Sequence, residues 1–214
     1  MVAENQLAQL HTGGEVLATG VSFEEYLTRF SGMHCELVGG VVIKMSPVSL
    51  QHIDLTGYLY MLIAAYFELR PIGRVITQPF TQRLPNVEPK REPDLLVVLN
   101  SNPYHLYETY MDGPADICIE IVSPDSIERD RGTKFAEYQK GGVGEYWILD
   151  PLIKESLFYH LDTEGLYAPQ YPDQDGNYRS VTLPGLLLNV PTLWQKPLPG
   201  IFSITESVKA MLAK

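Results

Sequence analysis

Two acidic residues stand in apolar surroundings, where their type and placement could support chemistry. Glu120 lies inside the run Ile117-Cys118-Ile119-Glu120-Ile121-Val122-Ser123-Pro124, in which five of eight residues are apolar and four of those are β-branched, as in a buried strand. Burying an unpaired carboxylate costs several kcal/mol, so Glu120 needs a cation, a proton or a metal ion. Asp94 begins a second apolar run, residues 94–99. Two acids on strands of one small domain are typical of a metal-dependent hydrolase.

Carboxylates on neighbouring strands favour one kind of cofactor. Mg²⁺ and Mn²⁺ are hard ions that prefer oxygen ligands, so Asp94 and Glu120 are candidate metal ligands. Such an ion can orient and activate a water molecule for hydrolysis. The cysteines Cys35 and Cys118 lack the spacing of a zinc site, and the chain has no Walker-type phosphate loop.

The composition limits the class of protein. The chain has 214 residues, enough to bury roughly 70% of its unfolded surface in one domain. It carries a net charge of −10, which opposes strong nonspecific binding to nucleic acid but is compatible with a metal site that collects carboxylates. There is no long apolar stretch and no signal-peptide pattern, and both cysteines fall in predicted strands. We therefore expect a cytoplasmic protein with buried thiols and no membrane partner.

Apolar periodicity and turn residues predict the elements that must position these acids. A capping box at Ser22 opens a short helix, and a longer helix over residues 49–69 stops before Pro71. A charged helix is predicted over residues 126–140, with Phe135 and Tyr138 turned inward, and a second capping box at Ser203 starts a terminal helix. The predicted strands, besides that of Glu120, are a hairpin over residues 36–38 and 41–43, then residues 74–78, 93–99, 145–149, 156–160, 166–168 and 178–183, with an irregular loop over residues 100–113.

These elements predict one α/β domain over residues 21–214 with a β-rich C-terminal part. Residues 1–20 have mixed polarity and no period, so they are predicted to form a flexible N-terminal arm.

Several segments in this order resemble a known family. They are Pro93-Asp94-Leu95, Ile119-Glu120-Ile121-Val122-Ser123-Pro124, Asp130, Lys134, Tyr138 and Gly142-Val143-Gly144-Glu145-Tyr146-Trp147-Ile148-Leu149-Asp150-Pro151. Together they resemble the Uma-type putative restriction endonuclease family of the PD-(D/E)XK nuclease superfamily, over about residues 22–190. The resemblance implies a restriction-endonuclease-like α/β (α+β) fold, in which helices flank a central mixed β-sheet and the N- and C-terminal parts add further strands.

The resemblance also implies roles for particular residues. Asp94 and Glu120 would bind Mg²⁺ or Mn²⁺ and, with Lys134, would form the catalytic set. The superfamily motif Glu-x-Lys would place the lysine at position 122, where Val122 stands instead. Lys134 lies on the next predicted helix, and its flexible stem could reach the same site and assist the attacking water.

Three auxiliary residues complete the predicted site. Glu36 could be an additional metal ligand, directly or through water, and His52 could face the cleft from the first turn of the long helix. Tyr138, one turn beyond Lys134, could steady the lysine or line the pocket. Each residue also has a structural interpretation, such as a salt bridge between Glu120 and Lys134 or Arg131.

Other polar residues near the motif receive weaker interpretations. The pairs Lys90-Arg91 and Arg129/Arg131 are candidate phosphate contacts, with ordinary surface charge as an equal alternative. Glu145 and Asp150 are interpreted as structural acids, and Tyr146 and Trp147 as packing residues.

Three functions remain open on the sequence. The first is a Mg²⁺-dependent DNA endonuclease, a homodimer because nucleases of this superfamily often pair to cut both strands. The second is a noncatalytic binding or assembly module, favoured by the net charge of −10 and by Val122. The third is a hydrolase of another phosphate ester that uses the same site.

Overall fold

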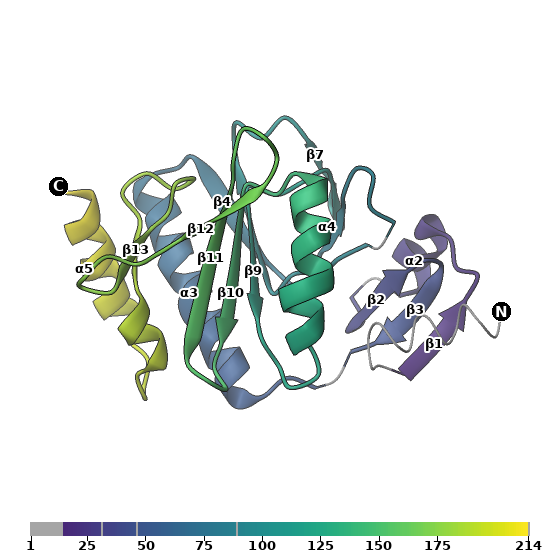
Figure 1. Ribbon diagram of the computed structural model, residues 1–214, viewed down its shortest axis with the longest axis horizontal. Coiled ribbons are helices and arrows are strands. Elements are labelled where there is room, and N and C mark those ends of the chain that lie inside the picture. The colour runs from purple at the N-terminus through teal and green to yellow at the C-terminus, as the bar shows by residue number, and fades with distance from the viewer. Residues whose placement is uncertain (1–14, 31, 46, 89, 214) are drawn as a thin grey trace.

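The structure is a computed structural model that describes residues 15–30, 32–45, 47–88 and 90–213 (Figure 1). Its elements, in chain order, are β1 (Glu15–Thr19), α2 (Phe23–Arg29), β2 (Cys35–Val38), β3 (Val41–Lys44), α3 (Leu50–Leu69), β4 (Gly73–Thr77), β5 (Thr81–Arg83), β6 (Leu95–Leu99), β7 (His105–Leu106), β8 (Tyr110–Asp112), β9 (Ile117–Ile121), the π-helical turn η1 (Arg129–Thr133), α4 (Lys134–Gly141), β10 (Glu145–Asp150), β11 (Glu155–Leu161), β12 (Tyr167–Gln170), β13 (Asn177–Arg179), β14 (Leu187–Asn189), the 3-10 turn η2 (Val190–Trp194) and α5 (Ile201–Leu212).

A six-stranded mixed sheet forms the centre of the molecule, in the order β12-β11-β10-β9-β6-β4. The strands β9 and β10 pair in parallel, and the other neighbours in this sheet pair antiparallel. Helix α3 covers one face and α4 covers the other, while α5 packs on the outer side of α3 (Figure 1). The predicted α/β fold with helices on both sides of a mixed sheet is confirmed.

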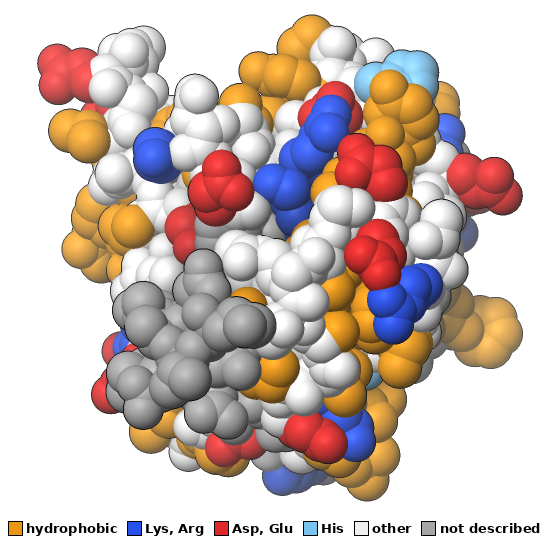
Figure 2. Space-filling model, turned by 90° about the vertical axis from the view of Figure 1, so that its right-hand side faces the viewer, with side chains coloured by type: hydrophobic (Ala, Val, Ile, Leu, Met, Phe, Trp, Pro, Cys, Tyr) orange, Lys and Arg blue, Asp and Glu red, His pale blue; other side chains and the backbone are white. Residues whose placement is uncertain are grey.

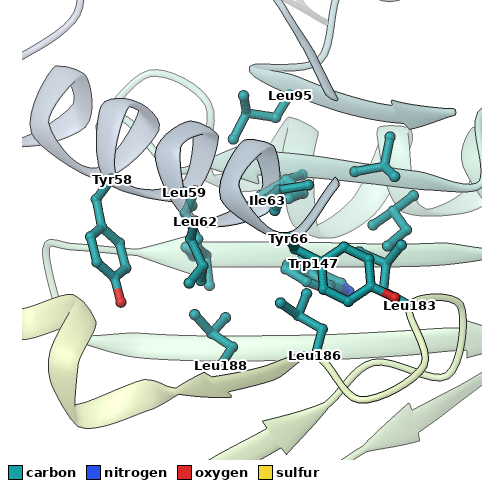
Figure 3. Packing of buried hydrophobic residues seen from close by; sticks show 14 of the residues in the cluster. Tyr58, Leu59, Leu62, Ile63, Tyr66, Leu95, Trp147, Leu183, Leu186 and Leu188 are labelled. Carbon is teal, nitrogen blue, oxygen red and sulfur yellow. The ribbon is translucent and has the colours of Figure 1, made fainter. Parts of the chain in front are cut away.

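Helix α3 builds most of one core layer. Ser49 caps it, because the Ser49 side chain accepts a hydrogen bond from the His52 backbone N–H, and the helix ends at Leu69, two residues before Pro71. Apolar side chains at helical spacing point from α3 toward the sheet and toward the C-terminal segment around Leu186 and Leu188 (Figure 3). Burial of this stripe orients the helix, whose first turn then lies at the end of the sheet where Asp94 directly precedes β6.

The pleat of β9 decides where Glu120 points. Ile117, Ile119 and Ile121 belong to the apolar cluster on the α3 side, whereas Cys118 belongs to the cluster on the α4 side. Successive side chains of a strand alternate between faces, so Glu120 faces α4. A buried carboxylate on this face can find a partner only from α4 or from the loops around it.

A second buried carboxylate, Glu145, holds the C-terminal segment on the sheet. It is fully buried at the start of β10 and accepts hydrogen bonds from Trp147 Nε1 at 2.8 Å, Tyr178 Oη at 2.6 Å and Ser180 Oγ at 2.9 Å. Several donors surround this carboxylate, so it needs no further ligand. The expected structural role of Glu145 fits these contacts.

The N-terminal part differs from the expected arm. Glu15–Thr19 forms β1, which pairs with β3 in a small sheet of order β1-β3-β2, set apart from the main sheet in Figure 1. Residues 1–14 lie outside the described part of the chain. The strand forms because Leu17 and Ala18 pack against the apolar cluster under α2, a tertiary contact that local sequence does not reveal.

Four other predicted elements need correction. The loop predicted over residues 100–113 contains β7 and β8, which join β5 in a three-stranded sheet. The helix predicted over residues 126–140 contains the π-helical turn η1, and the terminal helix begins at Ile201 with Gly200 as its cap rather than at the Ser203 capping box. The strand predicted over residues 178–183 ends at Arg179, and β14 pairs with it.

Two further findings bear on the expected class of protein. Cys35 and Cys118 are buried and free of disulfides. Across the described residues, no helix combines the length and the hydropathy that crossing a membrane requires.

Candidate active site

One pocket at the end of the central sheet collects most of the residues singled out from the sequence. The pocket is bounded by β2, β3 and the first turn of α3 on one side and by β9 and the start of η1 and α4 on the other. Its ionisable and amide-bearing lining comprises His34, Glu36, Lys44, His52, Gln78, Glu92, Asp94, Glu120, Asp125, Arg129, Asp130 and Lys134. The predicted set of Asp94, Glu120, Lys134, Glu36 and His52 is thus brought together.

Strand pairing makes the two proposed metal ligands neighbours. Leu95 pairs with Ile119 in the antiparallel β6–β9 ladder, so the same register extended by one residue places Asp94 opposite Glu120. Side chains at such directly opposed positions have Cβ atoms about 4.5–5.5 Å apart. The Ile121 backbone N–H donates to Asp94 Oδ2 at 2.7 Å, which fixes the Asp94 carboxylate beside the Glu120 segment.

Two side chains from other elements orient Asp94. Its Oδ1 atom lies 2.9 Å from His52 Nε2 and accepts a hydrogen bond from Gln78 Nε2 at 2.7 Å. Because Asp94 as a carboxylate only accepts hydrogen bonds, this geometry requires a proton on His52 Nε2. Asp94 therefore has three donors around it and is held in one orientation.

Glu120 is buried against the positive and polar groups of α4. Its Oε1 atom lies 2.8 Å from Lys134 Nζ and accepts a hydrogen bond from Tyr138 Oη at 2.7 Å. Burial raises the pKa of Glu120 above its ordinary value, and Lys134 opposes that shift. Tyr138 thus contacts Glu120 directly instead of steadying the lysine.

Lys134 reaches the site from the first residue of α4. Its Nζ atom also lies 3.3 Å from Asp130 Oδ1 and 3.7 Å from Glu36 Oε1. Burial by itself lowers the pKa of Lys134, but the surrounding carboxylates outweigh burial and raise it, so the group is an ammonium ion. Val122, at the position where the motif has lysine, is buried in the apolar cluster on this face of the sheet.

Glu36 enters the site from the N-terminal hairpin through a buried ion pair. Its Oε2 atom accepts a hydrogen bond from Arg91 Nη1 at 2.9 Å, and Arg91 also binds Glu137 through Nε at 2.7 Å. Burial acts to raise the pKa of Glu36, but Lys134 and Arg91 outweigh it and lower the pKa to about 2. Glu36 is therefore ionised and fastens the hairpin to α4.

Other site residues were given no role by the sequence. Glu92 accepts hydrogen bonds from Tyr26 Oη at 2.7 Å and Thr81 Oγ1 at 2.8 Å, and burial raises its pKa to about 7. Asp130 and Gln78 also line the pocket. The spacing of four residues between Asp130 and Lys134 was the one available signal, because it puts both side chains on one helix face.

The basic pairs near the site are only partly available for phosphate. Arg91 is 2% exposed and is engaged by Glu36 and Glu137. Arg131 binds Asp150 at 2.7 Å and Glu155 at 2.7 Å on the far side of η1, so it contacts neither Glu120 nor the pocket. Arg129 lines the pocket and Lys90 lies outside it.

The pocket contains more buried acid than buried base. Among the described residues, five buried carboxylates line it, namely Glu36, Glu92, Asp94, Glu120 and Asp130. The buried cations of the lining are Arg129 and Lys134, so its buried acids outnumber its buried bases. Burial raises the pKa values of Glu92 and Glu120, and neighbouring carboxylates add to both shifts.

The donor set suits a hard divalent cation. Asp94 and Glu120 offer carboxylate oxygens in a pocket whose buried acids outnumber its buried bases. In the described part of the chain, no group of three or more His, Cys, Asp or Glu side chains is arranged to hold a metal ion. Mg²⁺ is compatible with this arrangement because it commonly binds through one or two carboxylates and keeps several waters.

The fold and this site together define a class. A mixed sheet flanked by α3 and α4, with Asp94 and Glu120 on adjacent strands, is a restriction-endonuclease-like arrangement. Residues 22–191 match the Uma2 family, described as putative restriction endonucleases, and the chain belongs to this family. Family membership supports a nuclease function.

A solved structure supports the fold. A protein from Anabaena variabilis, described as a putative nuclease of the family DUF820, superposes with a TM-score of 0.67 over 81% of this chain and 97% of its own chain. The two sequences are 17% identical, so the likeness shows the fold alone. None of the curated proteins compared with the chain matches it.

The buried ion pairs of Arg91 lead to a first prediction, on stability. Arg91→Ala should lower the free energy of unfolding by about 3–5 kcal/mol, because Glu36 and Glu137 lose their buried partner. Arg83→Ala removes a partly exposed ion pair with Asp112 and should cost less than about 1 kcal/mol. Urea denaturation of both variants measures the difference, and equal losses would contradict a structural role for the Arg91 cluster.

Proposed function

We propose that this protein is a divalent-metal-dependent DNA endonuclease that hydrolyses phosphodiester bonds with Asp94, Glu120 and Lys134. The excess of buried carboxylates over buried cations in a pocket that also holds a lysine ammonium ion carries the proposal. Membership in the restriction endonuclease family supports the choice of substrate.

Each residue then has a defined task. Asp94 and Glu120 would hold the metal ion, which when bound activates water and neutralises charge on the phosphate. Lys134, already an ammonium ion, can donate a hydrogen bond to the attacking water or to a phosphate oxygen. His52 and Gln78 orient Asp94, and Tyr138 orients Glu120. Glu36 and Asp130 keep Lys134 charged and in place.

The surface charge fits a site that depends on its metal ion for attraction to DNA. The chain carries a net charge of −10, and Figure 2 shows Lys and Arg side chains interspersed with Asp and Glu on the face drawn there. Nonspecific affinity for DNA depends on phosphate neutralisation by basic side chains. We therefore expect weak binding to DNA in the absence of metal and a strong dependence of binding on Mg²⁺ or Mn²⁺.

Loss of either carboxylate should abolish the reaction. Asp94→Asn and Glu120→Gln keep the shape of the side chain and remove a charged ligand, so metal-dependent plasmid cleavage should fall on the order of a thousandfold. Glu164→Gln, in an exposed turn, is the control and should cleave as the wild type does. Cleavage that survives both substitutions would contradict the site.

A panel of nucleotides and phosphate esters separates DNA cleavage from hydrolysis of another phosphate ester.

Removal of the Lys134 ammonium group should strengthen metal binding and abolish catalysis. Lys134→Met removes the ammonium group 2.8 Å from Glu120 Oε1, so Mn²⁺ should bind roughly tenfold more tightly while cleavage is lost. Lys140→Met, on the exposed side of the same helix, should change neither property. Titration calorimetry with Mn²⁺ measures the affinity. Weaker Mn²⁺ binding by the Lys134 variant would show that the lysine and the ion do not share Glu120.

We also propose that the protein is a homodimer. The outer side of β4 pairs with no other strand within the described ranges, and an open edge can pair with a second copy. A surface groove beside β4 is lined by Tyr60, Arg74, Tyr107 and Glu108, and its two charges could pair across a two-fold axis. Light scattering over a series of concentrations should give the mass of a dimer, and a monomer throughout would refute this proposal.

A further inference from the structure

The helix that delivers Lys134 begins with an irregular turn. Residues Arg129–Thr133 form the π-helical turn η1, in which the Lys134 backbone N–H donates to the carbonyl oxygen of Arg129, five residues earlier. An α-helix would bond four residues back, so η1 contains one extra residue. Each residue of an α-helix corresponds to about 100° of rotation, so the extra residue decides which direction Lys134 faces.

The turn is fixed to the sheet by a buried hydroxyl group. Tyr146, on β10, is fully buried, and its Oη donates a hydrogen bond of 2.9 Å to the backbone carbonyl of Asp130. Asp130 and Lys134 are both lining residues of the pocket, whereas Tyr146 is not. The tyrosine therefore holds the backbone of the turn from behind, without contact with the pocket itself.

A second contact fixes the outer side of the same turn. Arg131 lies between the two inward-facing residues Asp130 and Lys134, and it binds Asp150 and Glu155 at the β10–β11 turn. Asp150 is in turn held by the backbone N–H groups of Leu152 and Ile153. The π-helical turn is thus tied to β10 and β11 at two points, while its opposite side presents Asp130 and leads into Lys134.

We propose that Tyr146 and Arg131 are positioning residues, which hold the π-helical turn so that the Lys134 ammonium group stays on Glu120. The inference rests on the proposed function for its catalytic consequence, but the structural claim concerns the turn alone. Loss of the Tyr146 hydroxyl leaves the buried Asp130 carbonyl without this donor and frees the turn to move. The Tyr146 ring still packs against Tyr138, 4.9 Å away between ring centroids, so Tyr138 stays in place.

Two tyrosine variants isolate this role. Tyr146→Phe removes the bond to the turn, and Tyr167→Phe removes an equivalent bond, because buried Tyr167 Oη donates to the carbonyl of Val143 at 3.0 Å beyond the other end of α4. Hydrogen exchange followed by mass spectrometry over residues 127–137 should be about tenfold faster in Tyr146→Phe and unchanged in Tyr167→Phe. Arg131→Gln should act in the same direction as Tyr146→Phe.

Kinetics then separate positioning from simple destabilisation. In Tyr146→Phe we expect kcat for plasmid cleavage to fall about tenfold with KM unchanged, whereas Tyr167→Phe should keep the wild-type kcat at a temperature where both are folded. Unchanged exchange in residues 127–137, or faster exchange with a wild-type kcat, would overturn the inference. A wild-type protein without cleavage would refute the proposed function. In that case two measurements on Tyr146→Phe decide the inference. The exchange rate over residues 127–137 must rise, and the affinity for Mn²⁺ must rise as it does in Lys134→Met.

Discussion

The buried pair of Glu120 and Lys134 is the interaction on which the rest of the site depends. The Glu120 carboxylate, on an inner strand, is largely removed from bulk water, so its charge must be met by another group within the fold. The 2.8 Å contact with Lys134 supplies part of that charge, and Tyr138 supplies a hydrogen bond to the same oxygen. Removal of one member would leave the other buried and unpaired, which ties α4 and β9 into one unit.

The same argument distinguishes the buried acids by function. Glu145 is as deeply buried as Glu120, but neutral donors from the surrounding chain hydrogen-bond to it, and it does not line this pocket. Glu36 is matched by Arg91 and Lys134. Asp94 and Glu120 share a pocket whose buried acids outnumber its buried bases, and this is why we propose these two as the ligands of a cation. Such a site costs stability, as functional sites commonly do.

The position of the lysine shows how a site can tolerate a change in its motif. Val122 completes an apolar cluster on the α4 side of the sheet, where a second buried charge beside Glu120 would need its own partners. Lys134 brings the ammonium group from the helix instead, and Asp130, one helical turn before it, accompanies it. The cost is that the lysine now depends on the geometry of η1, whereas a lysine two residues after Glu120 would be placed by the strand itself.

The sequence by itself determined the local elements and the chemical types of the site. Ser22, Ser49, Pro71 and the Gly39-Gly40 turn act on neighbouring residues, so the elements that they bound were predictable. Asp94 and Glu120 were recognisable as candidates from the apolar residues around them, and Lys134 from the family resemblance.

Only the tertiary structure decided the rest. The pairing of β6 with β9, the reach of Lys134 and the participation of Glu92, Asp130 and Gln78 all depend on residues distant in the chain. The strand β1 and the π-helical turn form because packing and long-range hydrogen bonds outweigh local preference there. The charge surplus of the pocket is a sum over elements that meet only in the folded protein, so no local pattern in the sequence could reveal it.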